Sequence, residues 1–162
     1  MEGITIRPIT AEDDQAIAEI IRGNLRAYHL DIPGTAYFDP ELDCLSAYYN
    51  AQPDKKRYFV AEQEDGVVAG GVGIAPFSGF EHCAELQKLY LADEAKGKGF
   101  GKQLMRTAEQ YAKAAGYHSL YLETHTNLEA AMGLYEKLGF RKIEKPAAVL
   151  HSTMNRFFLK QL

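Results

Sequence analysis

Glycine and lysine alternate in the segment 96–102, which reads Lys96, Gly97, Lys98, Gly99, Phe100, Gly101 and Lys102. An apolar, strand-like stretch ends at Leu91, and a helical pattern begins at Phe100. Glycine has no Cβ to hold a ligand away from the backbone, and the unpaired N–H groups at the start of a helix favour an anion. The segment therefore predicts a pyrophosphate site in an otherwise acidic chain.

Two common phosphate motifs do not fit this segment. A P-loop needs Ser or Thr after its Gly-Lys pair to hold magnesium, whereas Gln103 follows Lys102. A dinucleotide fingerprint needs two residues between its last two glycines, whereas one residue separates Gly99 from Gly101. A glycine-rich turn with hydrated lysines is the alternative that needs no ligand.

With this loop the chain resembles the GNAT acetyltransferases, whose phosphate loop reads Gln/Arg-x-x-Gly-x-Gly/Ala. Segment 96–101 matches it, except that Lys96 replaces Gln or Arg and so keeps the charge without the planar fork. Residues 127–140 are similar to the family's second signature, in which Asn127, Tyr135 and the pair Gly139-Phe140 hold the fixed positions. The element order from Ile4 to Leu159 also resembles that of the family.

The resemblance implies acetyl-CoA as the co-substrate, bound where the strand ending at Leu91 separates from the strand 119–125. The backbone of Leu89, Tyr90 and Leu91 would pair with the pantetheine arm like an added strand. The pyrophosphate would lie on the amides of 96–102, Asn127 would contact the cofactor, and Tyr135 would stand near its sulfur. The sequence has no Cys/His spacing typical of a metal site, and we expect no bound metal.

Acyl transfer to an amine requires a deprotonated amine, hydrogen-bond donors for the oxyanion and a proton for the departing thiolate. Tyr135 is the candidate general acid; the alternative is a core tyrosine whose hydroxyl is satisfied. Backbone N–H groups near Leu89 are the candidate donors, if a bulge frees them from the strand ladder. The sequence does not show that bulge.

Glu85 is the first candidate for the general base. It lies fourteen residues before Gly99, on the strand that would line the cleft, where some family members carry a catalytic glutamate. Partial burial would raise the pKa of this carboxylate; the alternative is a strand residue that pairs with a lysine. The weaker candidates are Glu81, His82, Glu123 and His125.

The loop from Leu30 to Pro40 is expected to cover the acceptor site, as the corresponding region does in the family. Asp31, Tyr37 and Asp39 lie in it, and its acids would suit a cationic amine. Solvated loop acids fit the sequence equally well.

Five aromatic residues have less specific interpretations. Tyr48, Tyr49 and Tyr58 are expected in the core or at its rim. Phe157 and Phe158 cannot face the same layer from one strand, so one is expected to face a partner chain or the acceptor site. A homodimer stays open on this basis.

Hydrophobic periodicity predicts strands at 4–7, 57–63, 67–75, 83–91, 119–125, 140–143 and 153–160, and helices at 11–28, 40–49, 100–115 and 127–138. Thr10 and Asn127 are expected to cap helices, Asp65-Gly66 to turn a hairpin, and Gly116 and Gly139 to end helices. The fold class is therefore α/β or α+β. The resemblance adds a mixed, mostly antiparallel twisted sheet with a central splayed parallel pair flanked by helices.

Composition predicts one domain over residues 1–162, located in the cytoplasm. The formal net charge of -4 disfavours nucleic acid as a partner. Cys44 and Cys83 form no ligand or CxxC pattern, which indicates a reduced compartment. Met1–Pro8 lacks a basic stretch followed by an apolar run, so we expect no signal peptide there, and no apolar stretch approaches the ~20 residues of a membrane span.

The sequence thus predicts an acetyl-CoA-dependent N-acetyltransferase in which an amine of a small molecule or peptide attacks the thioester directly. A non-catalytic acyl-CoA-binding sensor is the alternative; it would bind the cofactor without acetylating any amine. A nucleotide-binding regulator that uses Lys96–Lys102 is disfavoured by the glycine spacing. Polyamine, amino acid, antibiotic, peptide N-terminus and protein lysine all stay open as acceptors.

Overall fold

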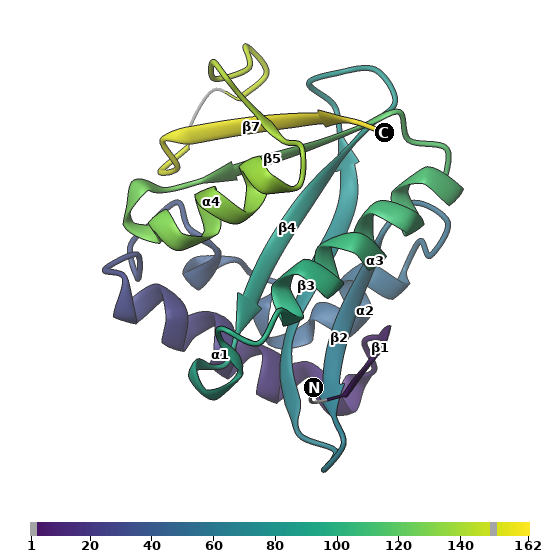
Figure 1. Cartoon of the computed structure of the whole chain (residues 1–162), viewed down its shortest axis with the longest axis vertical. Helices are drawn as coiled ribbons and strands as arrows, with labels where there is room; N and C mark the ends of the chain where they lie inside the picture. The colour runs from purple at the N-terminus through teal and green to yellow at the C-terminus, as the bar shows by residue number, and fades with distance from the viewer. Residues whose placement is uncertain (1–2, 150–151) are drawn as a thin grey trace.

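A seven-stranded sheet organises the chain in the computed structural model, which describes residues 3–149 and 152–162. The strand order is β1-β2-β3-β4-β5-β7-β6 (Figure 1). The strands are β1 Ile4–Pro8, β2 Arg57–Gln63, β3 Val68–Phe77, β4 Cys83–Leu91, β5 Ser119–Thr124, β6 Arg141–Ile143 and β7 Arg156–Gln161. All neighbours pair antiparallel except β4 and β5, so the predicted mixed, mostly antiparallel sheet is confirmed.

Helices cover both faces of this sheet. They are α1 Asp14–Ala27, α2 Leu45–Asn50, α3 Phe100–Ala114 and α4 Glu129–Lys137. The apolar sides of α1 and α2 share one core with β2 and β3, whereas α3 and α4 share another with the opposite face (Figure 1). None of the helices within the described residues has the length and apolar character that crossing a bilayer requires.

The parallel pair is the feature that makes room for a site. β4 and β5 pair over only three positions, from Cys83↔Ser119 to Glu85↔Tyr121. Beyond Glu85 the two strands diverge, as Figure 1 shows. The predicted splayed pair is therefore confirmed, and polar backbone groups of both strands are left without each other as partners.

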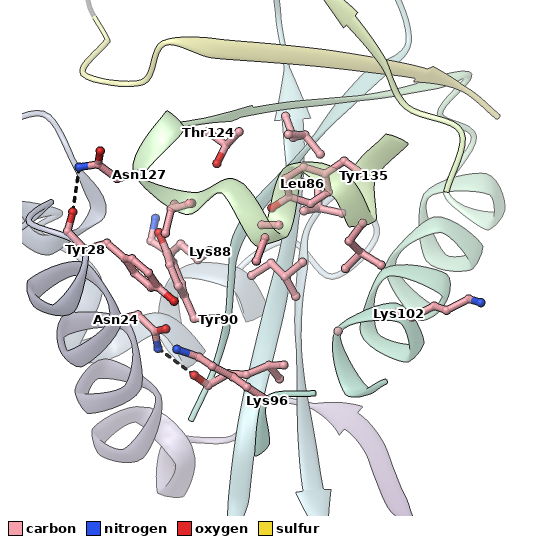
Figure 2. Close-up of a pocket in the computed structure, with 18 of the residues that line it drawn as sticks. Asn24, Tyr28, Leu86, Lys88, Tyr90, Lys96, Lys102, Thr124, Asn127 and Tyr135 are labelled. Carbon is pink, nitrogen blue, oxygen red and sulfur yellow. Dashed lines mark hydrogen bonds between the residues drawn. The ribbon is translucent and has the colours of Figure 1, made fainter. Parts of the chain in front are cut away.

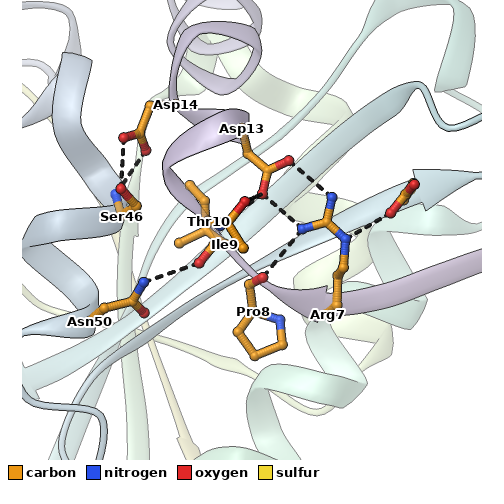
Figure 3. Close-up of polar contacts among 9 residues, drawn as sticks. Arg7, Pro8, Ile9, Thr10, Asp13, Asp14, Ser46 and Asn50 are labelled. Atoms are coloured by element: carbon orange, nitrogen blue, oxygen red, sulfur yellow. Dashed lines mark hydrogen bonds and ion pairs between the residues drawn. The ribbon is translucent and has the colours of Figure 1, made fainter.

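Polar contacts fix the entry into α1 (Figure 3). Thr10 caps the 3-10 turn Ala11–Asp13 that leads into the helix, as predicted, and its amide donates to Asp13 at 2.8 Å. Arg7 donates twice to the same carboxylate, at 2.8 and 3.0 Å, and its Nε donates to Glu62 at 2.7 Å. The end of β1, the neighbouring β2 and the start of α1 are thus tied together.

The predicted strands and helices agree with the structure in number, order and type, and most of their ends differ by no more than three residues. The exception is the helix predicted at 40–49, which begins only at Leu45 as α2, because a 3-10 turn at Leu42–Cys44 precedes it. Gly66, Gly116 and Gly139 all have positive φ, in agreement with the predicted turn and helix stops. The expectation that Asn127 caps a helix is wrong. The cap of α4 is Leu128, and the side-chain amide of Asn127 donates instead to the carbonyl of Tyr28 at 2.9 Å. Met1, the first residue of the segment 1–8 discussed above, lies outside the described residues.

Candidate active site

A cavity of about 900 Å³ opens where β4 and β5 diverge (Figure 2). Its walls come from both strands, the glycine loop, the first turn of α3, α4 and the end of α1. Ten of the residues proposed from the sequence line it: Leu89, Tyr90, Leu91, Lys96, Gly97, Gly99, Gly101, Lys102, Asn127 and Tyr135. Lys98, Phe100 and Glu85 are not among the lining residues, and the Phe100 side chain is buried in the core.

The glycine loop presents backbone amides to this cavity. Gly97 and Gly99 have φ of +78° and +83°, a conformation that side chains with a Cβ rarely adopt. Gly99 is the N-cap of α3, and the first helical bond runs from the Gln103 amide to its carbonyl at 3.3 Å. The amides before Gln103 are therefore not used by the helix and can bind an anion.

Two cationic side chains flank these amides. Lys96 lies 2.8 Å from Asp93, and its ammonium is 5.3 Å from the centre of the Tyr28 ring. Lys102 also lines the cavity, on the other side of the loop (Figure 2). Among the described residues, no three His, Cys, Asp or Glu side chains come together in a way that could hold a metal ion.

β4 contains a bulge beside the cavity. Gly71 pairs with Tyr90 and Gly73 with Gln87, so one residue of β3 faces two of β4, Lys88 and Leu89. Lys88 has a φ of +51°, which is unusual for a residue that is not glycine. The candidate oxyanion donors near Leu89 required a bulge that the sequence does not show, and the structure has one, which interrupts the ladder at this point.

Glu85 lies just before this bulge and is half-buried. Its carboxylate accepts a hydrogen bond from the side-chain NH₂ group of Gln87 at 2.9 Å. Burial raises the pKa of Glu85 to about 7; the Gln87 hydrogen bond and Lys88 oppose the increase, and the charges of Glu123 and Asp39 add to it. Such a carboxylate is partly ionised near neutral pH and can accept a proton.

Tyr135 enters the cavity from α4. Its ring packs against Phe140 and Phe158, with centroids 6.2 and 5.9 Å away. Burial raises the pKa of its hydroxyl, so the group stays protonated at neutral pH. None of the described residues hydrogen-bonds this hydroxyl, which is open to the cavity.

Glu85 and Tyr135 lie on opposite faces of the sheet. Leu86 shares a core with Tyr135, and side chains alternate along a strand, so Glu85 points to the other face. Tyr135 lines the cavity from one side of the sheet. Glu123, which alternates with Leu122 of the Tyr135 core, and Lys88 of the bulge line it from the other side. It therefore extends through the gap between β4 and β5.

The rival bases have other surroundings. Glu123 lines the cavity, but its carboxylate accepts from Tyr121 at 2.8 Å and from Ser152 at 3.1 Å. His125 Nδ1 accepts a hydrogen bond from the backbone N–H of Asn127 at 3.0 Å. Glu81 and His82 are exposed just before β4, at the end where β4 and β5 are paired.

The loop 30–40 lies against the bulge. The Lys88 ammonium is 2.6 Å from Asp39 and 3.7 Å from Glu41, and only 10 % of its side chain is exposed. Asp31 is exposed on the same loop, and the Tyr37 ring is half-buried. The ion pair of Lys88 had no counterpart in the sequence interpretation, because nothing local indicates that the two segments meet.

The five aromatic residues are mostly core residues. Tyr49 and Tyr58 are fully buried, and Tyr48 is 36 % exposed. Phe157 and Phe158 do face opposite layers, but both are buried within this chain. Neither ring is therefore presented to a partner chain.

Comparisons with known proteins agree with this geometry. The model of the family "Acetyltransferase (GNAT) family" matches residues 17–140. The uncharacterized N-acetyltransferase YjgM of Escherichia coli is 42 % identical over 141 residues, which is 86 % of this chain and 83 % of that protein. A Schizosaccharomyces pombe relative and the human N-acetyltransferase 8B are matched over just 52 % and 38 % of their own lengths.

Solved structures show the same fold. A GNAT-family acetyltransferase from Staphylococcus aureus superposes with a TM-score of 0.86 at 19 % identity, over 99 % of both chains. YncA of Salmonella typhimurium, a putative acetyltransferase solved with acetyl-CoA, superposes with a TM-score of 0.73 at 25 % identity, over 99 % of this chain and 93 % of that one.

Proposed function

The chain belongs to the GNAT family of acetyltransferases, and on that premise we propose that it moves the acetyl group of acetyl-CoA to an amine of a small molecule or peptide. The observation that carries the proposal is the cavity that joins the amides of the glycine loop to Tyr135 and to the bulge of β4. Residues 1–162 would act as one catalytic domain. A cytoplasmic location is proposed as well, since both cysteines are free thiols.

The residues present fit coenzyme A. The amides that follow Gly97 and Gly99, with Lys96 and Lys102 beside them, suit a diphosphate. The diverging strand segment Leu89–Leu91 offers backbone groups to an extended, amide-containing arm. A cavity of about 900 Å³ lies within the range of small-molecule sites.

Bound acetyl-CoA would supply the reactive thioester, and the chain would manage charge and protons around it. Glu85 would accept the proton of the acceptor ammonium, directly or through water, so that the amine can attack the carbonyl carbon. Backbone N–H groups at the Lys88–Leu89 bulge would stabilise the negative charge that develops on the carbonyl oxygen. As the carbon–sulfur bond breaks, the Tyr135 hydroxyl would give its proton to the sulfur, and the second proton that the attacking nitrogen loses would return to Tyr135 through solvent.

Thermal unfolding with and without acetyl-CoA tests the binding part of this proposal. We expect millimolar acetyl-CoA to raise the melting temperature, because a ligand that binds only the folded state stabilises it, whereas NAD and ATP should have little effect. The Gly99→Ala variant should lose most of the shift, since a Cβ at φ +83° strains the loop. Gly116→Ala is the matched control, with a φ of +94° at the far end of α3.

A thiol-release screen of amines tests the catalytic part. Release of coenzyme A that depends on both acetyl-CoA and an amine supports the enzyme. Binding without release for any amine in a broad panel would favour the sensor alternative. No thermal shift with acetyl-CoA would count against both.

A further inference from the structure

Glycines on β3 let two buried tyrosines reach β4 from behind. Tyr49 comes from α2 and Tyr58 from β2, and both are fully buried. A Cβ on Gly73 would lie 2.6 Å from the Tyr49 hydroxyl oxygen, and a Cβ on Gly71 would overlap the Tyr58 ring. Because neither glycine has a side chain, the two tyrosine side chains can pass over β3 at these positions.

The two tyrosine hydroxyls end on neighbouring residues of β4. Tyr58 donates to the carbonyl of Lys88 in the bulge at 2.9 Å. Tyr49 donates to the side-chain carbonyl of Gln87 at 2.6 Å, and the Gln87 amide donates to Glu85 at 2.9 Å. An unbroken chain of hydrogen bonds thus runs from the core under α2 to the carboxylate of Glu85.

We propose that Tyr49 is a positioning residue that acts through Gln87 to hold the Glu85 carboxylate in the orientation and ionised form that a proton acceptor needs. This inference rests on the proposed function, in which Glu85 is the base. Gln87 connects Tyr49 to Glu85, because its side chain is hydrogen-bonded to both of them.

The direction of the hydrogen bonds follows from the carboxylate, which can only accept and so takes the NH₂ group of the Gln87 side chain. Burial raises the pKa of Tyr49 well above its ordinary value, so its hydroxyl keeps its proton and has one to donate. It donates to the carbonyl oxygen of Gln87, which leaves the NH₂ group turned toward Glu85. A donor at this point favours the carboxylate over the protonated acid.

Several other groups act on Glu85. From β5, the Glu123 charge opposes ionisation of Glu85, and the Tyr121 hydroxyl lies nearby. The charge of Asp39, on the loop 30–40, also opposes ionisation, whereas Lys88, on β4 itself, favours it. Glu41 pairs with Lys88, and the neutral thiol of Cys83 completes the surroundings. Of all the influences that favour the carboxylate, the Gln87 hydrogen bond is the largest.

The test compares kcat/KM against pH for wild type, Gln87→Leu, Tyr49→Phe and the double variant, with Tyr48→Phe as the matched control from the same helix. Loss of a hydrogen bond to a charged group should move the acidic limb of Gln87→Leu upward by about one pH unit. Its kcat/KM should then fall about tenfold near pH 6 and recover near pH 9. Tyr49→Phe should move the limb in the same direction, and Tyr48→Phe should not move it.

The double variant decides whether Tyr49 works through Gln87. If it does, Tyr49→Phe adds no further shift in the Gln87→Leu background. An equal loss of kcat/KM at every pH for Tyr49→Phe would indicate a structural role and overturn the proposal, as would additive shifts in the double variant.

A titration of ¹³C-labelled glutamate by NMR reads the same effect without turnover, with Glu85→Gln to assign the signal. We expect the Glu85 titration to move upward in Gln87→Leu and in Tyr49→Phe. A wild type that acetylates no amine would contradict the proposed function, whereas an active wild type with an unmoved Glu85 titration would contradict this inference alone.

Discussion

At the residue scale, burial acts in the same direction on Glu85 and Tyr135, the two residues for which we propose opposite roles in proton transfer. The same loss of hydration raises both pKa values, because it disfavours the charged form of each group. For Glu85 the result is a carboxylate that titrates at about 7 and can take up a proton. For Tyr135 it is a hydroxyl that keeps its proton at neutral pH and therefore has one to offer to the departing sulfur.

Replacing Tyr135 with Phe should therefore affect turnover more than binding. We expect kcat to fall by about 10²-fold, the usual scale of general acid catalysis, while the affinity for acetyl-CoA changes little. The ring contacts with Phe140 and Phe158 are retained in the variant. Steady-state kinetics and calorimetric titration with coenzyme A measure the two quantities, and unchanged kcat would remove Tyr135 from the mechanism.

Glu85 and Tyr135 could be named from the sequence because both lie at fixed spacings from a recognisable motif. Gln87 and Tyr49 could not, since the two residues are 38 positions apart and meet across β3. Their contact depends on glycines that look like interruptions of a strand when the sequence is considered alone. Side-chain facing along β4 also depends on the bulge at Lys88, which no local pattern predicts.

At the element scale, the start of α1 depends on one carboxylate. Asp13 accepts from Arg7 and from the Thr10 amide, and its side chain is 5 % exposed (Figure 3). Burial by itself would raise the pKa of Asp13, but the hydrogen bonds from Arg7 and Thr10 outweigh it and hold the pKa below its usual value. Local periodicity predicted α1 and its cap, but not Arg7 as the partner.

An Asp13→Asn substitution should lower the free energy of unfolding at pH 7 by about 2 kcal/mol, the scale of a hydrogen bond to a charged group. Because the folded pKa is depressed, the contribution is complete above the unfolded pKa of about 3.9 and fades as the pH falls toward the folded value. Urea unfolding of both proteins at pH 7 and at pH 3 measures this. The neighbouring, exposed Glu12→Gln serves as control, and a difference that is the same at both pH values would contradict the ion-pair explanation.

At the scale of the whole molecule, the site spans the sheet. The glycine loop and Tyr135 belong to the face covered by α3 and α4, whereas Glu85 belongs to the face covered by α1 and α2. The order of elements was predictable because each has its own local period. That the site has residues on two faces could not be predicted without the strand order. In that order β4 and β5 are neighbours, although α3 separates them in the sequence.

This arrangement predicts sequential kinetics. If the amine approaches from the Glu85 side and acetyl-CoA occupies the α3 side, both are bound together and no acetyl-enzyme is needed. Initial-rate plots at several fixed amine concentrations should intersect, and coenzyme A should compete with acetyl-CoA but not with the amine. Parallel plots, or an acetylated enzyme in the mass spectrum, would contradict it; the buried thiol of Cys83, whose pKa is raised by burial, is a poor nucleophile for such a route.

The glycines of β3 also allow the residues that hold Glu85 to lie apart from the loop 30–40, where we expect the acceptor amine to be selected. The hydrogen bonds that reach Glu85 through Gln87 start from Tyr49 of α2, whereas Ile32 and Phe38 stand exposed on the loop 30–40. Because neither residue belongs to the hydrogen-bond chain, we expect substitutions at those two positions to leave Tyr49, Gln87 and Glu85 undisturbed. If the loop 30–40 covers the acceptor site, as the sequence led us to expect, the choice of amine can be changed by substitutions in the loop without altering the residues that hold Glu85.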